Sequence, residues 1–158
     1  MKQVHIWVDA DSCPRMVRSY ILRYALKLTL PVTFVANHQI PVTENSTYEM
    51  IICEKTPDAA DNYIVLHAET HDMVITRDIP LAARCVEKNI CILNDRGTIY
   101  TKENIHQRLS ERNFSLQLAQ IGLGSNGAIS YGKKEFAAFA DCFDKAIHQL
   151  IKNTGLSK

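Results

Sequence analysis

Short apolar runs alternate with amphipathic stretches over the first two thirds of the chain. The apolar runs predict five strands, at residues 2–8, 31–36, 49–53, 73–76 and 90–93. Apolar residues three and four positions apart predict helices between them, at residues 14–28, 56–70 and 79–87. Strands that alternate with helices, and that are apolar throughout, indicate a parallel sheet covered on both faces.

The last third of the chain predicts two further helices and no linker that would divide it into domains. One helix runs from Thr101 to about Ala119, and the other spans residues 134–152. A glycine-rich loop at residues 122–127 joins them. We therefore expect one α/β domain over residues 1–158, with a helical extension from about residue 101. Its expected architecture is a three-layer α/β/α fold with a five-stranded, mainly parallel sheet in the order 3-2-1-4-5.

Composition excludes several classes of protein. A hydrophobic content of 46% and a charged content of 22% are ordinary for a globular chain of 158 residues. The net charge of +1 predicts no partner, so a nucleic acid would need a local basic patch. No run approaches the ~20 apolar residues that span a membrane, and early acids interrupt any export signal. Five cysteines without a C-x-x-C pair predict reduced thiols and a cytoplasmic location.

Acidic side chains follow the predicted strands. Asp9 and Asp11 come directly after the first strand, two residues apart, so their side chains are expected to leave the backbone on the same side. Asp78 follows the fourth strand, while Asp58 and Asp61 share a face of the helix after the third. Because the carboxyl ends of parallel strands meet at one edge of a sheet, Asp9 and Asp78 are expected to lie close together.

Each acid also has a structural explanation. Asp78 can cap the helix that begins at Ile79, and Asp58 and Asp61 suit the positive end of a helix. These explanations do not account for convergence, because two carboxylates ~5 Å apart repel by roughly 3 kcal/mol at an effective dielectric of 20. Oxygen ligands favour Mg²⁺ or Mn²⁺ over zinc. The predicted metal ligands are Asp9, Asp11, Asp58, Asp61 and Asp78, whereas Asp72 and Asp95 are assigned to the surface or to turns.

Helix starts and basic residues complete the predicted site. Ser12 is expected to cap the first helix and Thr56 the second. Divalent ions beside basic side chains suit phosphodiester hydrolysis, which needs an activated water, a neutralised phosphate and a stabilised leaving oxygen. The predicted substrate-binding residues are Arg15, Asn37, Thr76, Arg77 and Arg96.

Several segments resemble the bacterial YaiI/YqxD family, over most of residues 4–115. They include Ile-Trp-Val-Asp-Ala-Asp-Ser-Cys-Pro at 6–14, Val-Ala-Asn at 35–37, Asp-Ala-Ala-Asp-Asn-Tyr-Ile-Val at 58–65, Met-Val-Ile-Thr-Arg-Asp-Ile-Pro-Leu-Ala-Ala at 73–83, Leu-Asn-Asp-Arg-Gly at 93–97 and Tyr-Thr-Lys-Glu-Asn-Ile at 100–105. The family is largely uncharacterised and is similar to the PIN-like nuclease superfamily, whose acids follow strand one, lie on a helix and follow strand four. The resemblance implies a ribonuclease that uses Mg²⁺ or Mn²⁺, with catalytic residues at Asp9, at Asp58 or Asp61, and at Asp78.

The chain departs from the family pattern in three places. PIN nucleases usually carry Glu on the helix, where this chain has Asp. The family's Leu-Asn-Pro-Arg-Gly has Asp95 in place of Pro, and its C-terminal Gly-Gly-Pro loop is replaced by residues 122–127.

Two other functions stay open. A haloacid-dehalogenase-like phosphatase also begins with Asp-x-Asp after a strand, with Asp9 as nucleophile and Asp11 as general acid. It needs a positioned lysine, for which Lys88 is a candidate, and a late acidic pair that the sequence does not show. A non-catalytic domain that binds a metal and RNA would keep the acids without turnover. The oligomeric state is left open by the pattern.

Overall fold

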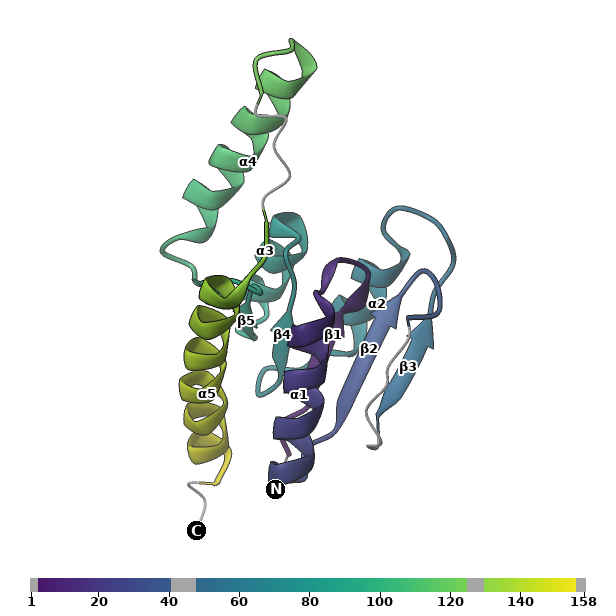
Figure 1. Cartoon of the computed structure of the whole chain (residues 1–158), viewed down its shortest axis with the longest axis vertical. Helices are drawn as coiled ribbons and strands as arrows, with labels where there is room; N and C mark the ends of the chain where they lie inside the picture. Colours follow the sequence, from purple (N-terminus) through teal and green to yellow (C-terminus); the bar gives the residue numbers. More distant parts are fainter. Residues whose placement is uncertain (1–2, 41–47, 125–129, 156–158) are drawn as a thin grey trace.

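The computed structural model describes residues 3–40, 48–124 and 130–155, and it has the expected three-layer α/β/α architecture (Figure 1). Among these residues, six strands form one sheet in the order β3-β2-β1-β4-β5-β6. The strands are β1 (Ile6–Asp9), β2 (Val32–Ala36), β3 (Glu49–Ile52), β4 (Met73–Ile75), β5 (Cys91–Leu93) and β6 (Ile99–Tyr100). The predicted order of the first five strands is confirmed, and all of their pairings are parallel.

Helices cover both faces of the sheet. They are α1 (Arg15–Leu28), α2 (Ala59–His67), α3 (Ile79–Glu87), α4 (Ile105–Gln120) and α5 (Lys133–Gly155), with a short 3₁₀ helix, η1 (Ala10–Ser12), after β1. One core lies between the sheet and the pair α1 and α5, and the second lies between the sheet and the pair α2 and α3. None of the described helices is long and apolar enough to cross a lipid bilayer.

The two cores explain why the central strands are apolar at every position. Ile6 and Val8 belong to the core under α1 and α5, whereas Trp7 belongs to the core under α2 and α3. Every residue of β1 and β2 is buried, while the first and last residues of the edge strand β3 are exposed. Burial on both faces is what a parallel sheet between two helical layers requires.

Two predicted helix caps are wrong. Ser12 closes η1, and Pro14 occupies the N-cap position of α1 without a side-chain capping bond. Thr56 lies in a turn, in which its carbonyl accepts a hydrogen bond from Ala59 N at 3.3 Å, and Asp58 takes the N-cap position of α2. In both places a tight turn comes between the polar residue and the helix, so the capping residue type alone misplaced the start.

The turn after β5 leads into a strand that the sequence did not predict. Asn94 Oδ1 accepts hydrogen bonds from the backbone N–H groups of Arg96 and Thr98, each at 2.9 Å. Gly97 has a φ of +84°, and a Cβ there would lie 2.5 Å from Ala138 O, so this position requires glycine. The turn reverses the chain into β6, which pairs antiparallel with β5. Two residues are too few to show a strand pattern.

Candidate active site

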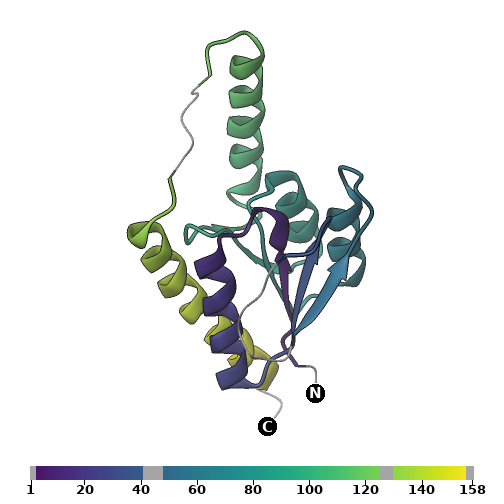
Figure 2. The same ribbon diagram turned by 45° about the vertical axis from the view of Figure 1, so that its right-hand side comes forward.

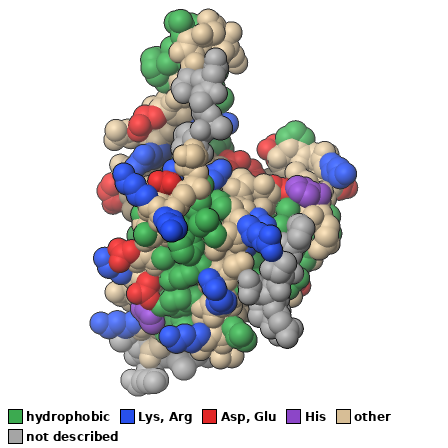
Figure 3. Space-filling model, in the orientation of Figure 1, with side chains coloured by type: hydrophobic (Ala, Val, Ile, Leu, Met, Phe, Trp, Pro, Cys, Tyr) green, Lys and Arg blue, Asp and Glu red, His purple; other side chains and the backbone are tan. Residues whose placement is uncertain are grey.

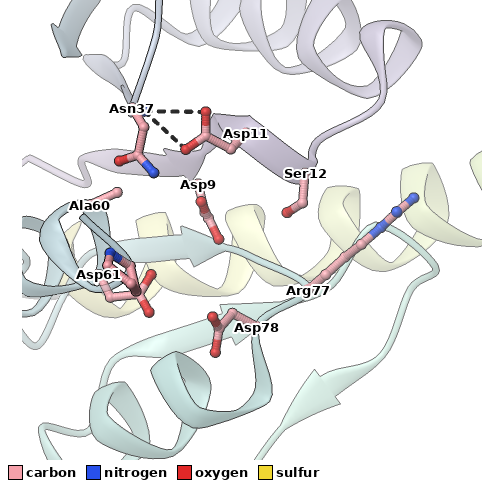
Figure 4. Close-up of a pocket in the computed structure, with 9 residues that line it drawn as sticks. Asp9, Asp11, Ser12, Asn37, Ala60, Asp61, Arg77 and Asp78 are labelled. Carbon is pink, nitrogen blue, oxygen red and sulfur yellow. Dashed lines mark hydrogen bonds between the residues drawn. The ribbon is translucent and has the colours of Figure 1, made fainter. Parts of the chain in front are cut away.

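A pocket of about 360 Å³ lies at the edge of the sheet where β1 and β4 end and α2 begins (Figure 4). Four of the predicted acids line it, together with two of the predicted substrate-binding residues. The lining residues are Asp9, Asp11, Ser12, Asn37, Pro57, Ala60, Asp61, Arg77 and Asp78. Because the carboxyl ends of parallel strands meet at one edge of the sheet, this pocket brings together side chains up to 69 positions apart in the sequence, from Asp9 to Asp78.

Asp9 is the last residue of β1 and is buried. Val8 pairs with Ile75 across the sheet, which places the next residues, Asp9 and Thr76, side by side. The Thr76 hydroxyl donates a hydrogen bond of 2.7 Å to Asp9 Oδ2. Burial raises the pKa of Asp9 to about 6, and the nearby charges of Asp78 and Asp11 add to the rise, against the opposing effect of the Thr76 hydrogen bond.

Asp61 and Asp78 face each other across the same pocket, and Figure 4 shows the carboxyl groups of both turned toward Asp9. Burial raises the pKa of Asp61 well above its usual range, and the charges of Asp78 and Asp9 raise it further. The position of the Asp78 side chain beside Asp61 adds to this rise in the pKa of Asp61. Three acids from three elements are thus held together in one pocket.

Asp78 also has the structural role that was expected of a lone acid. Its Oδ1 accepts a hydrogen bond of 2.9 Å from Leu81 N, so it caps α3, which begins at Ile79. Its own backbone N–H donates to Thr76 Oγ1 at 2.9 Å. The helix cap fixes the carboxyl group in place and leaves Oδ2 for the pocket.

Asp11 does not leave the backbone on the same side as Asp9. It lies in η1, where the two-residue alternation of a strand no longer applies. Its carboxylate accepts hydrogen bonds from Asn37 N, at 2.9 Å to Oδ2 and 3.2 Å to Oδ1, and lies 3.2 Å from His38 Nδ1. Figure 4 shows Asp11 turned toward Asn37, away from Asp61 and Asp78. Asp11 therefore joins the end of β1 to the end of β2.

Other predicted site residues lie outside the pocket lining. Asp58 is exposed at the N-cap position of α2, and Arg15 is exposed at the start of α1. Thr76 is buried beneath Asp9 and supports it. The Arg96 guanidinium lies 5.6 Å from the centre of the Tyr131 ring and donates to Ser130 O at 3.3 Å.

Arg77 lines the pocket but is already paired. Its guanidinium contacts Asp95 Oδ2 at 2.5 Å through both Nε and one terminal nitrogen. Asp95 is buried, and its Oδ1 has no hydrogen-bond partner among the described residues. Asp95 lies in the turn after β5, which agrees with its assignment to the surface or to turns, but its side chain is buried by the ion pair with Arg77. Figure 4 shows Arg77 extending away from Asp61 and Asp78.

The donor chemistry of Asp9, Asp61 and Asp78 fits a hard divalent cation such as Mg²⁺ or Mn²⁺. In the described part of the chain, no three acidic, histidine or cysteine side chains form a preformed metal site. Burial and the neighbouring acids raise the pKa values of Asp9 and Asp61, and a positive charge in the pocket would favour the ionised form of both carboxyls. A divalent cation bound among these carboxyls would supply that charge.

Comparisons with known proteins identify relatives but no activity. A family model described as an uncharacterised bacterial family, YaiI/YqxD, matches residues 7–149. A UPF0178 protein of Treponema denticola is 43% identical over 151 residues, which cover 96% of each chain. A UPF0178 protein of Psychromonas ingrahamii is 44% identical over 149 residues, covering 94% of this chain and 99% of the relative. No solved structure matches the chain.

Proposed function

The chain belongs to the YaiI/YqxD family, and from the site that it carries we propose that it is a metal-dependent nuclease that hydrolyses phosphodiester bonds in RNA. The observation that carries the proposal is the meeting of Asp9, Asp61 and Asp78 in one pocket, with raised pKa values at Asp9 and Asp61. Acids that are costly to hold together without a cation are the usual framework of a divalent-metal site. The choice of RNA rests on the resemblance to PIN-like nucleases.

The residues of the pocket divide into metal-binding and substrate-positioning groups. Asp9, Asp61 and Asp78 would hold Mg²⁺ or Mn²⁺, which supplies an activated water and neutralises the phosphate when bound. Asn37 lines the same pocket and offers an amide to the substrate. Arg77 can bind a phosphate at the rim, since part of its guanidinium remains exposed while Asp95 fixes its direction.

The geometry favours the nuclease over the phosphatase alternative. A phosphatase would use Asp11 as general acid beside Asp9, but Asp11 is directed to Asn37 and held by its backbone N–H. Its candidate lysine, Lys88, donates hydrogen bonds to the carbonyls of Val65 and Ala68, at 2.5 and 2.7 Å. Those carbonyls belong to the C-terminal end of α2, whereas the pocket is at its N-terminal end. Neither residue therefore serves the phosphatase mechanism.

Substitution of Asp61 by Asn is expected to lower cleavage of single-stranded RNA at least about a hundredfold. Groups that merely support a metal ligand cost 10–100-fold when lost, and a ligand should cost no less. Asp58→Asn is the matched control, because it makes the same chemical change three residues away, on an exposed side chain outside the pocket. Its activity should stay within about threefold of wild type.

Both variants are assayed on a fluorescently labelled single-stranded RNA with millimolar Mn²⁺, and again with a chelator. Equal loss in Asp58→Asn and Asp61→Asn would contradict the assignment of the pocket. A wild-type protein that binds RNA in Mn²⁺ and leaves it intact would identify the non-catalytic binding domain instead.

A further inference from the structure

Helix α4 projects beyond the carboxyl edge of the sheet, away from the rest of the molecule (Figures 1 and 2). We call residues 105–124 the arm. At its base, Ile105 is buried in the core beside α3. Farther out, the arm carries four large apolar side chains that are mostly uncovered, with exposed fractions of 61% for Phe114, 47% for Leu116, 68% for Ile121 and 70% for Leu123.

These side chains occupy opposite sides of the arm. Phe114 and the C-cap residue Ile121 are seven residues apart and share one side of α4, and Leu116 lies on the opposite side. Leu123 follows the end of the helix, where its backbone N–H donates to Leu118 O at 2.8 Å. The chain folds back tightly at Gly124, where a Cβ would lie 2.9 Å from Ala119 Cα, but all four side chains remain exposed. A helix that is apolar on opposite sides is normally buried, and a helix of this length is marginally stable without packing.

The outer part of the arm, from Asn113 onward, carries no charged side chain. From Asn113 to Gly132 the sequence contains no Asp, Glu, Lys, Arg or His, although 22% of the chain is charged. Figure 3 shows hydrophobic and no charged side chains at the outer end of the arm on the face in view. A surface that lacks charged residues and exposes apolar side chains is typical of the centre of a protein–protein interface. A nucleic-acid surface would instead need Lys or Arg.

We propose that the arm is a dimerisation element, which packs antiparallel against the arm of a second copy of this chain. A twofold contact places the same surface on both partners, so any charge near its centre would face a like charge. With the axis midway between Phe114 and Ile121, the charged residues Glu111 and Arg112 of each arm lie opposite the uncharged outer end of the partner's arm. Phe114 of one copy then packs beside Ile121 of the other. This inference does not depend on the proposed nuclease activity.

The test measures the molar mass of the full chain by light scattering during size-exclusion chromatography, from micromolar to near-millimolar concentration. Wild type is expected to be a dimer. Phe114→Glu should weaken dimerisation at least about thirtyfold, because a buried charge replaces a central aromatic contact. Leu66→Glu is the matched control, since Leu66 is 77% exposed on α2 in the body of the molecule, and it should leave the dimer intact.

Circular dichroism melts show whether each variant is folded, and Phe114→Glu should melt as a folded monomer because its side chain is exposed in one copy. A second variant tests the register. Adding Ile121→Lys to Phe114→Glu places opposite charges together across the antiparallel contact, so the double variant should regain the dimer. A wild-type monomer at every concentration, an arm that instead binds lipid vesicles as a monomer, or a Phe114→Glu protein that stays dimeric would each overturn the proposal.

Discussion

Asp9→Asn should lose at least about a hundredfold of Mn²⁺-dependent RNA cleavage, and it should gain stability when no cation is present. The pKa of Asp9 is raised to about 6, so at about pH 8 the fold must hold this carboxylate ionised in a buried place. A rise of about two units corresponds to roughly 3 kcal/mol of opposed folding free energy. Asparagine still accepts the hydrogen bond from Thr76 and carries no charge, so we expect a gain of about 1–2 kcal/mol after the cost of burying its amide.

Asp11→Asn provides the control for this result. Asp11 is at the same edge of the sheet, but its carboxylate is turned toward Asn37 rather than toward Asp61 and Asp78. Its cleavage rate should stay within about fivefold of wild type. If Asp9→Asn instead loses about 0.5–2 kcal/mol of stability and responds to Mn²⁺ as wild type does, then Asp9 serves only as a structural group.

Asp72→Ala should be the most destabilising substitution of an acidic residue, at about 3–5 kcal/mol in a urea unfolding titration. The buried Asp72 carboxylate accepts hydrogen bonds from His5 N at 3.2 Å, Trp7 Nε1 at 3.0 Å and Glu69 N at 2.9 Å. It therefore ties the start of β1 to the loop before β4. Alanine would leave buried donors without an acceptor, and each bond to a charged group contributes ~1.5–3 kcal/mol.

Asp141→Ala is the matched control for Asp72→Ala. Asp141 is exposed on α5 and pairs with Lys145 one helical turn away, at 3.1 Å. A surface pair of this kind contributes about 0.5 kcal/mol or less. Similar unfolding midpoints for the two variants would contradict the role given to Asp72.

The strand order and the meeting of Asp9 with Asp78 could be predicted because both follow from general rules. Continuous apolar strands between helices imply a parallel sheet, and such a sheet gathers its carboxyl ends at one edge. The choice of Asp61 over Asp58 could not be made in the same way. Helical spacing places Asp58 and Asp61 on the same side of a helix. In the structure α2 begins only at Ala59, so Asp58 lies before the helix and Asp61 alone of the two lines the pocket.

Burial of Asp72 and Asp95 escaped prediction for a different reason. Each lies beside a turn among polar neighbours, so the local pattern predicts exposure. Their partners are distant in sequence, with Trp7 65 positions from Asp72 and Arg77 18 positions from Asp95. A buried acid is stabilised by such partners, and single-position patterns carry no information about them. The direction of Asp11 was missed because η1 interrupts the strand alternation.

Thermal melts of the wild type with and without millimolar Mn²⁺, at about pH 5 and about pH 8, test the metal site most directly. In the folded protein the pKa values of Asp9 and Asp61 are raised above the ordinary 3.8, so their protonation stabilises the fold. That contribution is complete below pH 3.8 and is lost as the pH rises through about 6, so without cation the melting temperature should fall from pH 5 to pH 8. Mn²⁺ should raise it by roughly 5–10 °C at pH 8, where the carboxylates are ionised, and by far less at pH 5, where Asp9 carries a proton. A melting temperature at pH 8 that does not respond to Mn²⁺ or Mg²⁺ would contradict the metal site.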